Sequence, residues 1–120
     1  MEIPAHILIV EDSDLVSDAL RILFESADYR VSTASTVAAA LGVSRADPPD
    51  LTLLDLTLPD GDGLVLVEPL HIAGCKTVVA LTGHDDYATK ARCLAAGCGD
   101  VLVKPVPARE LLAKSSAWLG

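Results

Sequence analysis

Leu51-Thr52-Leu53-Leu54-Asp55 is the stretch of sequence that decides the fold of this chain, and Leu56-Thr57-Leu58-Pro59-Asp60-Gly61-Asp62-Gly63 follows it directly. The first five residues form an apolar run that ends in a carboxylate, which is typical of a strand buried in a parallel sheet. Such a strand delivers its last side chain to the carboxyl edge of the sheet. We therefore expect Asp55 to act there as a nucleophile or a metal ligand.

Three other apolar segments have the same form. Ile7-Leu8-Ile9-Val10 leads into Glu11-Asp12, Val78-Val79-Ala80-Leu81 leads into Thr82-Gly83, and Val101-Leu102-Val103 leads into Lys104-Pro105. The functional crevice of an open α/β sheet lies outside the carboxyl ends of its strands. We therefore expect three acids, a hydroxyl and an ammonium group to meet in one site.

Strand patterns alternate with helical patterns along the whole chain. We predict strands near residues 6–10, 30–34, 51–55, 77–81 and 101–103, and helices near 14–26, 36–46, 63–73, 85–96 and 107–118. This alternation implies parallel strands joined by right-handed crossovers. The predicted fold class is α/β, a doubly wound five-stranded parallel sheet with five helices. The length of 120 residues suits a single domain that spans residues 1–120.

Several local features refine this prediction. In the first helix, helical spacing predicts that Leu15 and Val16 face inward and that Ser17 faces outward. Pro69 should kink or stop the third helix near residues 65–69, and Gly97 should close the fourth as a left-handed cap. Pro107 suits the first turn of the last helix. Four acids are interpreted as loop and helix-cap residues: Asp60, Asp62, Asp85 and Asp86.

Composition and charge exclude several classes of protein. The formal net charge is −8 and the nine Lys and Arg residues are scattered, which argues against nucleic-acid binding by this domain. No apolar run approaches the roughly 20 residues that cross a bilayer, and the N-terminus lacks the regions of a signal peptide. The three cysteines lack zinc-ligand spacing and indicate reduced thiols in a cytoplasmic protein.

The residues at the strand ends favour one kind of chemistry. Glu11, Asp12 and Asp55 offer only hard oxygen ligands, which favour Mg²⁺. Aspartate is a known nucleophile for phosphoryl transfer and forms an acyl phosphate. Lys104 would supply positive charge at the phosphoryl oxygens, and Thr82 a hydroxyl donor, so the set provides the positioning and charge neutralisation that phosphoryl transfer needs.

These residues, in this order, resemble the receiver domain of two-component response regulators over essentially the whole chain. The matching elements are Glu11-Asp12, Asp55, Leu58-Pro59-Asp60-Gly61-Asp62-Gly63, Thr82, Ala95-Ala96-Gly97 and Lys104-Pro105. The resemblance implies the flavodoxin-like strand order 2-1-3-4-5. It also implies a switch that a histidine kinase or a histidine phosphotransfer domain phosphorylates, and that a downstream effector or output domain reads.

The resemblance also implies a role for each matching residue. Asp55 would be the phosphoacceptor. Mg²⁺ would be held directly by Asp12, Asp55 and the backbone carbonyl of Thr57, and by Glu11 through water. Lys104 would pair with Asp55 and later with the phosphoryl group, towards which Thr82 would turn, and a cis peptide would precede Pro105. Such a domain catalyses only its own phosphorylation and dephosphorylation and is not a metabolic enzyme.

Two positions raise separate hypotheses. Many receivers carry Tyr or Phe where this chain has Val101, so we expect weaker coupling from Thr82 to the face of the fourth helix, fifth strand and fifth helix. Thr57 and His84 lie where the family tunes hydrolysis of the acyl phosphate. His84 is interpreted either as a group that guides water or as an exposed loop histidine.

Other functions stay open at the level of sequence. An aspartyl phosphatase of the haloacid dehalogenase type shares the nucleophile, Mg²⁺, Thr and Lys, but it usually has a second Asp where Thr57 stands, and a cap domain. A flavodoxin-like module would need a phosphate-cradling loop in place of Val10-Glu11-Asp12-Ser13-Asp14. A degenerate receiver would act as a constitutive protein-binding module. Trp118 and Leu119 are interpreted as packing against the domain's own core, and a weak homodimer or interdomain contact through the last helix is the alternative.

Overall fold

The computed structural model describes residues 3–120 and contains one five-stranded parallel sheet. Its strands are β1 (His6–Val10), β2 (Arg30–Ala34), β3 (Leu51–Asp55), β6 (Thr77–Thr82) and β7 (Asp100–Val103). They lie in the order β2-β1-β3-β6-β7, which confirms the predicted order 2-1-3-4-5. Every neighbouring pair is parallel, so all five carboxyl ends lie along the same edge.

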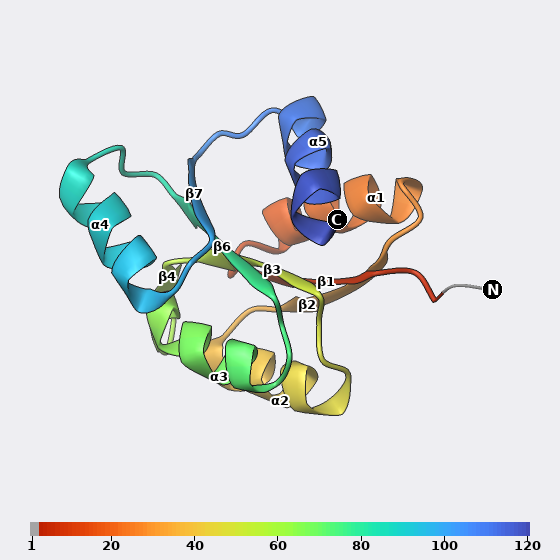
Figure 1. Cartoon of the computed structure of the whole chain (residues 1–120), viewed down its shortest axis with the longest axis horizontal. Coiled ribbons are helices and arrows are strands. Elements are labelled where there is room, and N and C mark those ends of the chain that lie inside the picture. Colours follow the sequence, from red (N-terminus) through yellow and green to blue (C-terminus); the bar gives the residue numbers. More distant parts are fainter. Residues whose placement is uncertain (1–2) are drawn as a thin grey trace.

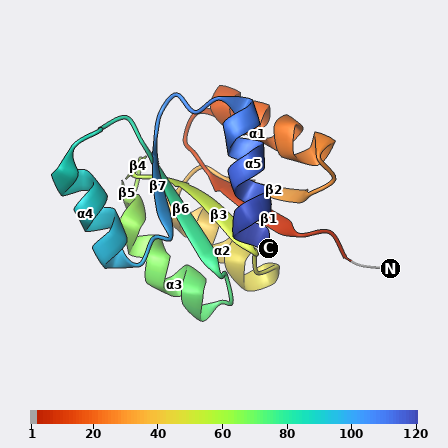
Figure 2. The ribbon, with the colours of Figure 1, turned by 45° about the horizontal axis from the view of Figure 1, so that its top comes forward.

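Helices cover both faces of the sheet (Figures 1 and 2). One layer holds α1 (Asp14–Ser26) and α5 (Ala108–Leu119), and the other holds α2 (Val37–Ala46), α3 (Val67–Ile72) and α4 (Tyr87–Ala96). Each layer has its own buried cluster of aliphatic side chains. Phe24 is fully buried on the α1 side, whereas the free thiols of Cys75, Cys93 and Cys98 are all buried on the α2–α4 side.

The first turn of α1 differs from the helical-spacing prediction. Ser17 is buried, whereas Leu15 is 82% exposed and Val16 is 39% exposed. Leu20 and Leu23 do pack against the core, so the predicted inward stripe holds in the later turns. The spacing of apolar residues cannot show where the helix reaches beyond its neighbours, and here it leaves two apolar side chains exposed in the turn that follows Glu11-Asp12.

The segment after β3 contains a small hairpin that the sequence did not predict. It consists of β4 (Thr57–Leu58) and β5 (Gly61–Asp62), in which Thr57 pairs with Asp62. A 3₁₀ turn, η1 (Gly63–Leu66), then precedes α3. The predicted break in the third helical segment is present, between η1 and α3. Pro69 does not interrupt α3 itself, because it lies in the first turn of that helix, where a backbone N–H would have no partner within the helix.

The other local predictions are mostly confirmed. Gly97 closes α4 with a φ of +109°. The Lys104–Pro105 peptide is cis. Pro107 is the N-cap of α5 rather than a residue of its first turn. Asp86 caps α4 by accepting the Thr89 N–H at 2.9 Å.

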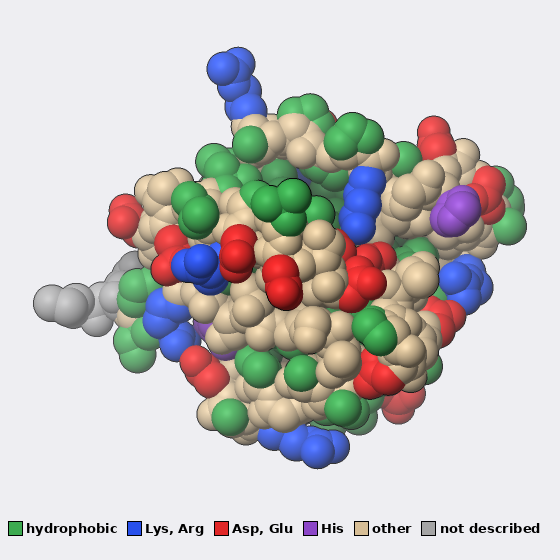
Figure 3. Space-filling model, turned by 180° about the vertical axis from the view of Figure 1, so that it is seen from behind, with side chains coloured by type: hydrophobic (Ala, Val, Ile, Leu, Met, Phe, Trp, Pro, Cys, Tyr) green, Lys and Arg blue, Asp and Glu red, His purple; other side chains and the backbone are tan. Residues whose placement is uncertain are grey.

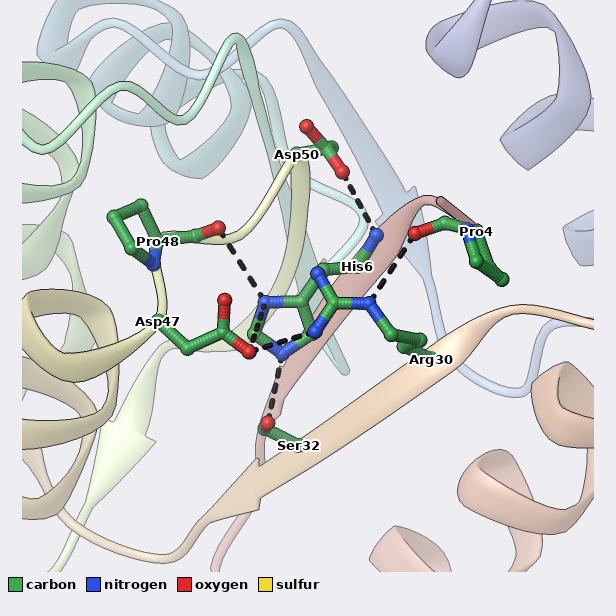
Figure 4. Close-up of polar contacts among 7 residues, drawn as sticks. All are labelled: Pro4, His6, Arg30, Ser32, Asp47, Pro48 and Asp50. Atoms are coloured by element: carbon green, nitrogen blue, oxygen red, sulfur yellow. Dashed lines mark hydrogen bonds and ion pairs between the residues drawn. The ribbon is translucent and has the colours of Figure 1, made fainter. Parts of the chain in front are cut away.

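A polar cluster holds the amino edge of the sheet, at the opposite end of the strands from Asp55 (Figure 4). His6 is 1% exposed; its Nε2 lies 2.7 Å from Ser32 Oγ and its backbone N–H donates to Asp50 at 2.8 Å. Arg30 donates to Asp47 at 2.8 Å, and this bond lowers the pKa of the Asp47 carboxyl. The cluster joins the starts of β1 and β2 to the loop that enters β3. Among residues 3–120, no helix is both long and apolar enough to cross a bilayer.

Candidate functional site

The strand register brings the predicted site residues to one edge. Val10 is level with Leu54, so Glu11 and Asp55 come next on neighbouring strands. On the other side of β3, Asp55 is level with Leu81, and Thr82 is the last residue of β6. Thr82 pairs with Val103, and Lys104 follows. The site depends on this register, because a slip of one residue would turn each of these side chains to the opposite face of the sheet.

Three carboxylates meet at this edge. Glu11, Asp12 and Asp55 each place a carboxylate oxygen within 4.8 Å of the other two. Their exposure is graded, since Glu11 is buried, Asp55 is partly buried and Asp12 is exposed. Like charges this close repel one another unless a cation lies among them. The three carboxylates therefore have the spacing of a cation site, and a bound cation would reduce their mutual repulsion.

Lys104 supplies one positive charge to this group. Its Nζ donates to Glu11 Oε2 at 3.0 Å and lies 3.5 Å from Asp55 Oδ2. Burial raises the pKa of Glu11, although hydrogen bonds from Lys104 and from the Ser13 N–H act in the opposite direction. Burial alone would lower the pKa of Lys104, but the hydrogen bond to Glu11 and the charge of Asp55 outweigh it, so the pKa is raised. The ammonium group stays protonated and is shared between two carboxylates.

Thr82 lies on the far side of Asp55 from Glu11. Its side chain is buried, and its Oγ1 accepts the backbone N–H of His84 at 3.0 Å. Its carbonyl accepts the Lys104 N–H at 2.7 Å, so the loop that carries Lys104 is tied to the end of β6. The His84 side chain is exposed. The hydroxyl of Thr82 thus already holds the loop between β6 and α4.

The segment after Asp55 packs tightly against it. The Thr57 N–H donates to Asp55 Oδ1 at 3.1 Å. The Gly63 N–H donates to the Leu56 carbonyl at 2.8 Å, and a Cβ at Gly63 would overlap the carbonyl oxygen of Asp55. Gly63 is therefore required by close backbone approach. The carbonyl of Thr57 as a metal ligand stays a prediction.

The donor set fits Mg²⁺. Mg²⁺ takes oxygen ligands and is usually bound through one or two carboxylates with several retained waters. The partly exposed Asp55 and the exposed Asp12 suit direct coordination with water present. The buried Glu11, already bonded to Lys104 and Ser13, suits a role through water. The close carboxylates together with one ammonium group leave net negative charge for a divalent ion to neutralise.

Comparison with known proteins identifies the family. The family model of the response regulator receiver domain matches residues 7–116 of this chain. The chain is 33% identical to the TorCAD operon transcriptional regulatory protein TorR of Escherichia coli O157:H7, over 92% of this chain and 48% of TorR. It is 36% identical to the transcriptional regulatory protein KdpE of Mycobacterium tuberculosis, over 92% of this chain and 49% of KdpE.

A solved structure agrees with these sequence matches. The crystal structure of a two-component response regulator from Clostridium difficile superposes with a TM-score of 0.90 at 27% identity, over 96% of this chain and 95% of that one. The chain therefore belongs to the response regulator receiver domain family of two-component signalling. It spans about half the length of the curated relatives. Membership of this family favours the receiver interpretation over the phosphatase and flavodoxin-like alternatives.

Sequence reasoning missed two features of the site. The interpretation of Asp60 as a cap residue is confirmed, but the helix that it caps is α2. The two N–H groups that its carboxylate accepts belong to residues 22 and 23 positions earlier in the chain. No local signal indicates such a distant partner. The requirement for Gly63 was also missed, although its place at the end of Asp60-Gly61-Asp62-Gly63 was a signal that could have been followed.

Proposed function

We propose that this receiver domain accepts a phosphoryl group on Asp55 in a Mg²⁺-dependent reaction, and that the modification switches a protein-binding face. The observation that carries the proposal is the convergence at one sheet edge. Carboxylate oxygens of Glu11, Asp12 and Asp55 lie within 4.8 Å of one another, and Lys104 Nζ is 3.5 Å from Asp55 Oδ2. A bound Mg²⁺ would supply charge neutralisation for an incoming phosphoryl group and for the acids themselves.

In the proposed reaction, a carboxylate oxygen of Asp55 attacks the phosphorus of a phosphohistidine. The P–N bond breaks, the imidazole leaves with the electron pair, and an acyl phosphate forms on Asp55. Lys104, now shared between Glu11 and Asp55, turns to the phosphoryl oxygens. Thr82 exchanges its bond with the His84 N–H for a bond to the phosphoryl group, which moves the loop before α4. Water later attacks the phosphorus, the bond from phosphorus to the Asp55 oxygen breaks, and inorganic phosphate leaves as the carboxylate is regenerated.

The donor would reach Asp55 along a surface that α1 and α5 provide. An apolar groove runs between these helices and ends at Lys104 and Pro105 (Figure 3). Leu20, Val106 and Leu111 line both the part of the groove near Ile22 and the part near Lys104. The proposed donor is a histidine kinase or a histidine phosphotransfer domain, and the proposed reader of the switched face is a downstream effector or an output domain. We further propose that residues 1–120 form one such domain, located in the cytoplasm.

Beryllofluoride, which mimics the acyl phosphate, provides the test. Backbone amide spectra are recorded with Mg²⁺ and beryllofluoride for the wild-type protein and for Asp55→Asn. We expect Mg²⁺-dependent shifts around Asp12, Thr82 and Lys104 in the wild type and their loss in the variant. An unresponsive wild type would contradict the proposal and would indicate a degenerate receiver that binds partners constitutively.

A further inference from the structure

The tip of the β4–β5 hairpin is joined to a helix from a different part of the chain. Asp60, in the turn between the two short strands, directs its carboxylate at the start of α2. Its Oδ1 accepts the Val37 N–H at 2.8 Å and its Oδ2 accepts the Ala38 N–H at 3.1 Å. Both carboxylate oxygens are thus used, one on each of two consecutive backbone donors, which gives the contact a fixed geometry.

The start of α2 provides a suitable partner for a charged side chain. The first N–H groups of a helix lack partners within the helix, and the helix dipole favours negative charge there. Thr36 Oγ1 accepts the third of these donors, from Ala39, at 3.0 Å. The bonds from Val37 and Ala38 lower the pKa of Asp60, so the side chain is a carboxylate at neutral pH. Helix α2 is therefore capped by two side chains, of which only Thr36 is local.

The base of the same hairpin contacts the proposed phosphoacceptor. Thr57 donates its N–H to Asp55 Oδ1 at 3.1 Å, and Gly63 donates to the Leu56 carbonyl at 2.8 Å. The hairpin itself is short, with two residues in each strand. So short a pair of strands has little stability of its own. Its orientation thus depends on contacts with other parts of the chain. Asp60 provides the contact with α2 at the tip, and Asp62 pairs with Arg92 of α4 at 2.7 Å.

We propose that Asp60 is a positioning residue for the acidic site: its bonds to α2 hold the hairpin so that the Thr57 N–H stays on Asp55 and the Thr57 carbonyl stays available to Mg²⁺. The inference rests on the proposed function, because it assigns Asp60 a part in the Mg²⁺ site. Asp60 does not touch the reacting atoms. Its effect is transmitted by the backbone of residues 57–60.

Three variants separate this role from simple helix capping. Asp60→Ala removes the bonds to α2. Thr36→Ala removes a cap from the same helix end and leaves the hairpin untouched. Asp62→Asn removes one negative charge from the same hairpin and its ion pair with Arg92 of α4 at 2.7 Å, while the amide oxygen can still accept the Leu64 N–H that Asp62 now accepts. The first variant tests positioning, the second controls for loss of helix stability, and the third controls for loss of charge and of the hairpin's contact with α4.

Two measurements are made on each protein. Mg²⁺ affinity is measured by titration of the backbone amide spectrum, and exchange of the Thr57 N–H is measured without metal. We expect Asp60→Ala to weaken Mg²⁺ binding about 5- to 20-fold, corresponding to about 1–2 kcal/mol, and to speed Thr57 exchange. We expect both controls to stay within twofold of the wild type.

Either of two results would overturn the inference. One is an Asp60→Ala protein with wild-type Mg²⁺ affinity and wild-type Thr57 exchange. The other is an equal loss in Thr36→Ala, which would assign the effect to helix stability, or in Asp62→Asn, which would assign it to charge or to the contact between the hairpin and α4. Absence of Mg²⁺ binding by the wild type would contradict the proposed function instead. The exchange measurement needs no metal, and in that case it would still show whether Asp60 holds the hairpin in place.

Discussion

Replacement of Lys104 by Met should destabilise the metal-free protein at neutral pH. Lys104 Nζ lies 3.0 Å from Glu11 Oε2 and 3.5 Å from Asp55 Oδ2, and Glu11 is 4% exposed. Removal of one partner of a fully buried ion pair costs roughly 3–5 kcal/mol, because the other charge stays buried without compensation. The Lys104 side chain is 33% exposed, so water offsets part of that loss. We expect a loss of about 2 kcal/mol, which lowers Tm by roughly 6–12 °C for a domain of this size.

The sign of the pH dependence follows from Glu11. Burial raises its folded-state pKa above the ordinary value of 4.5, so the folded state binds a proton more readily than the unfolded state does. Ionised Glu11 therefore destabilises the fold at pH values above its folded-state pKa, and this effect fades as pH falls towards 4.5. Lys104→Met removes two of the effects that lower this pKa, so it rises further. The destabilisation should be full near pH 8 and smaller near pH 5.

Urea unfolding of wild type and variant at pH 8 and pH 5, each with and without Mg²⁺, measures these effects. Mg²⁺ should recover part of the loss at pH 8, because a divalent cation replaces the missing positive charge. Lys114→Met is a matched control, because Lys114 in α5 is also partly buried but forms no ion pair within the described residues 3–120. Equal losses for Lys104→Met at both pH values, or no recovery with Mg²⁺, would refute the reasoning.

Three other predictions concern the same edge of the sheet. Asp55→Asn should raise Tm without metal, because it removes repulsion from Glu11; an unchanged or lower Tm in a thermal melt would count against this. Gly63→Ala should cost roughly 1–3 kcal/mol in urea unfolding, because its Cβ would overlap the Asp55 carbonyl, and a neutral effect would show that the backbone there yields easily. Val101 is partly buried against the core, so beryllofluoride should shift the α4–β7–α5 amides less than in a receiver with an aromatic residue there; equal shifts would disprove weaker coupling.

The sequence predicted most of the fold because its strands are nearly continuous in apolar residues. Burial on both faces makes such strands easy to locate, and the residue that ends each one is then placed by the parallel arrangement. The placement of Asp55, Thr82 and Lys104 at one edge of the sheet was predicted in this way. The hairpin after Asp55 was missed because strands of two residues carry no periodic signal. Its position depends on Asp60 and the start of α2, which are distant in sequence, and only the folded chain brings them together.

The first turn of α1 shows a second limit. Helical spacing placed Leu15 inside, but it is 82% exposed. Spacing shows which residues share a side of a helix; it does not show how far the neighbouring elements extend along that side. The exposed turn follows directly on Glu11-Asp12, so the sequence indicated that the three acids lie together but not that an apolar surface lies next to them.

The placement of the cysteines makes the two layers of the fold experimentally separable. Cys75, Cys93 and Cys98 are buried on the α2–α4 side of the sheet, and burial raises the pKa of Cys98 to about 12. A thiol reagent reacts with the exposed thiolate, so labelling requires the α2–α4 layer to open first. The labelling rate would then report opening of α2, α3 and α4 without any introduced probe. The layer of α1 and α5 has no cysteine, so its opening would not contribute to thiol labelling. Trp118 lies in α5, and its fluorescence would report on that layer. A comparison of the two signals would show whether both layers open together.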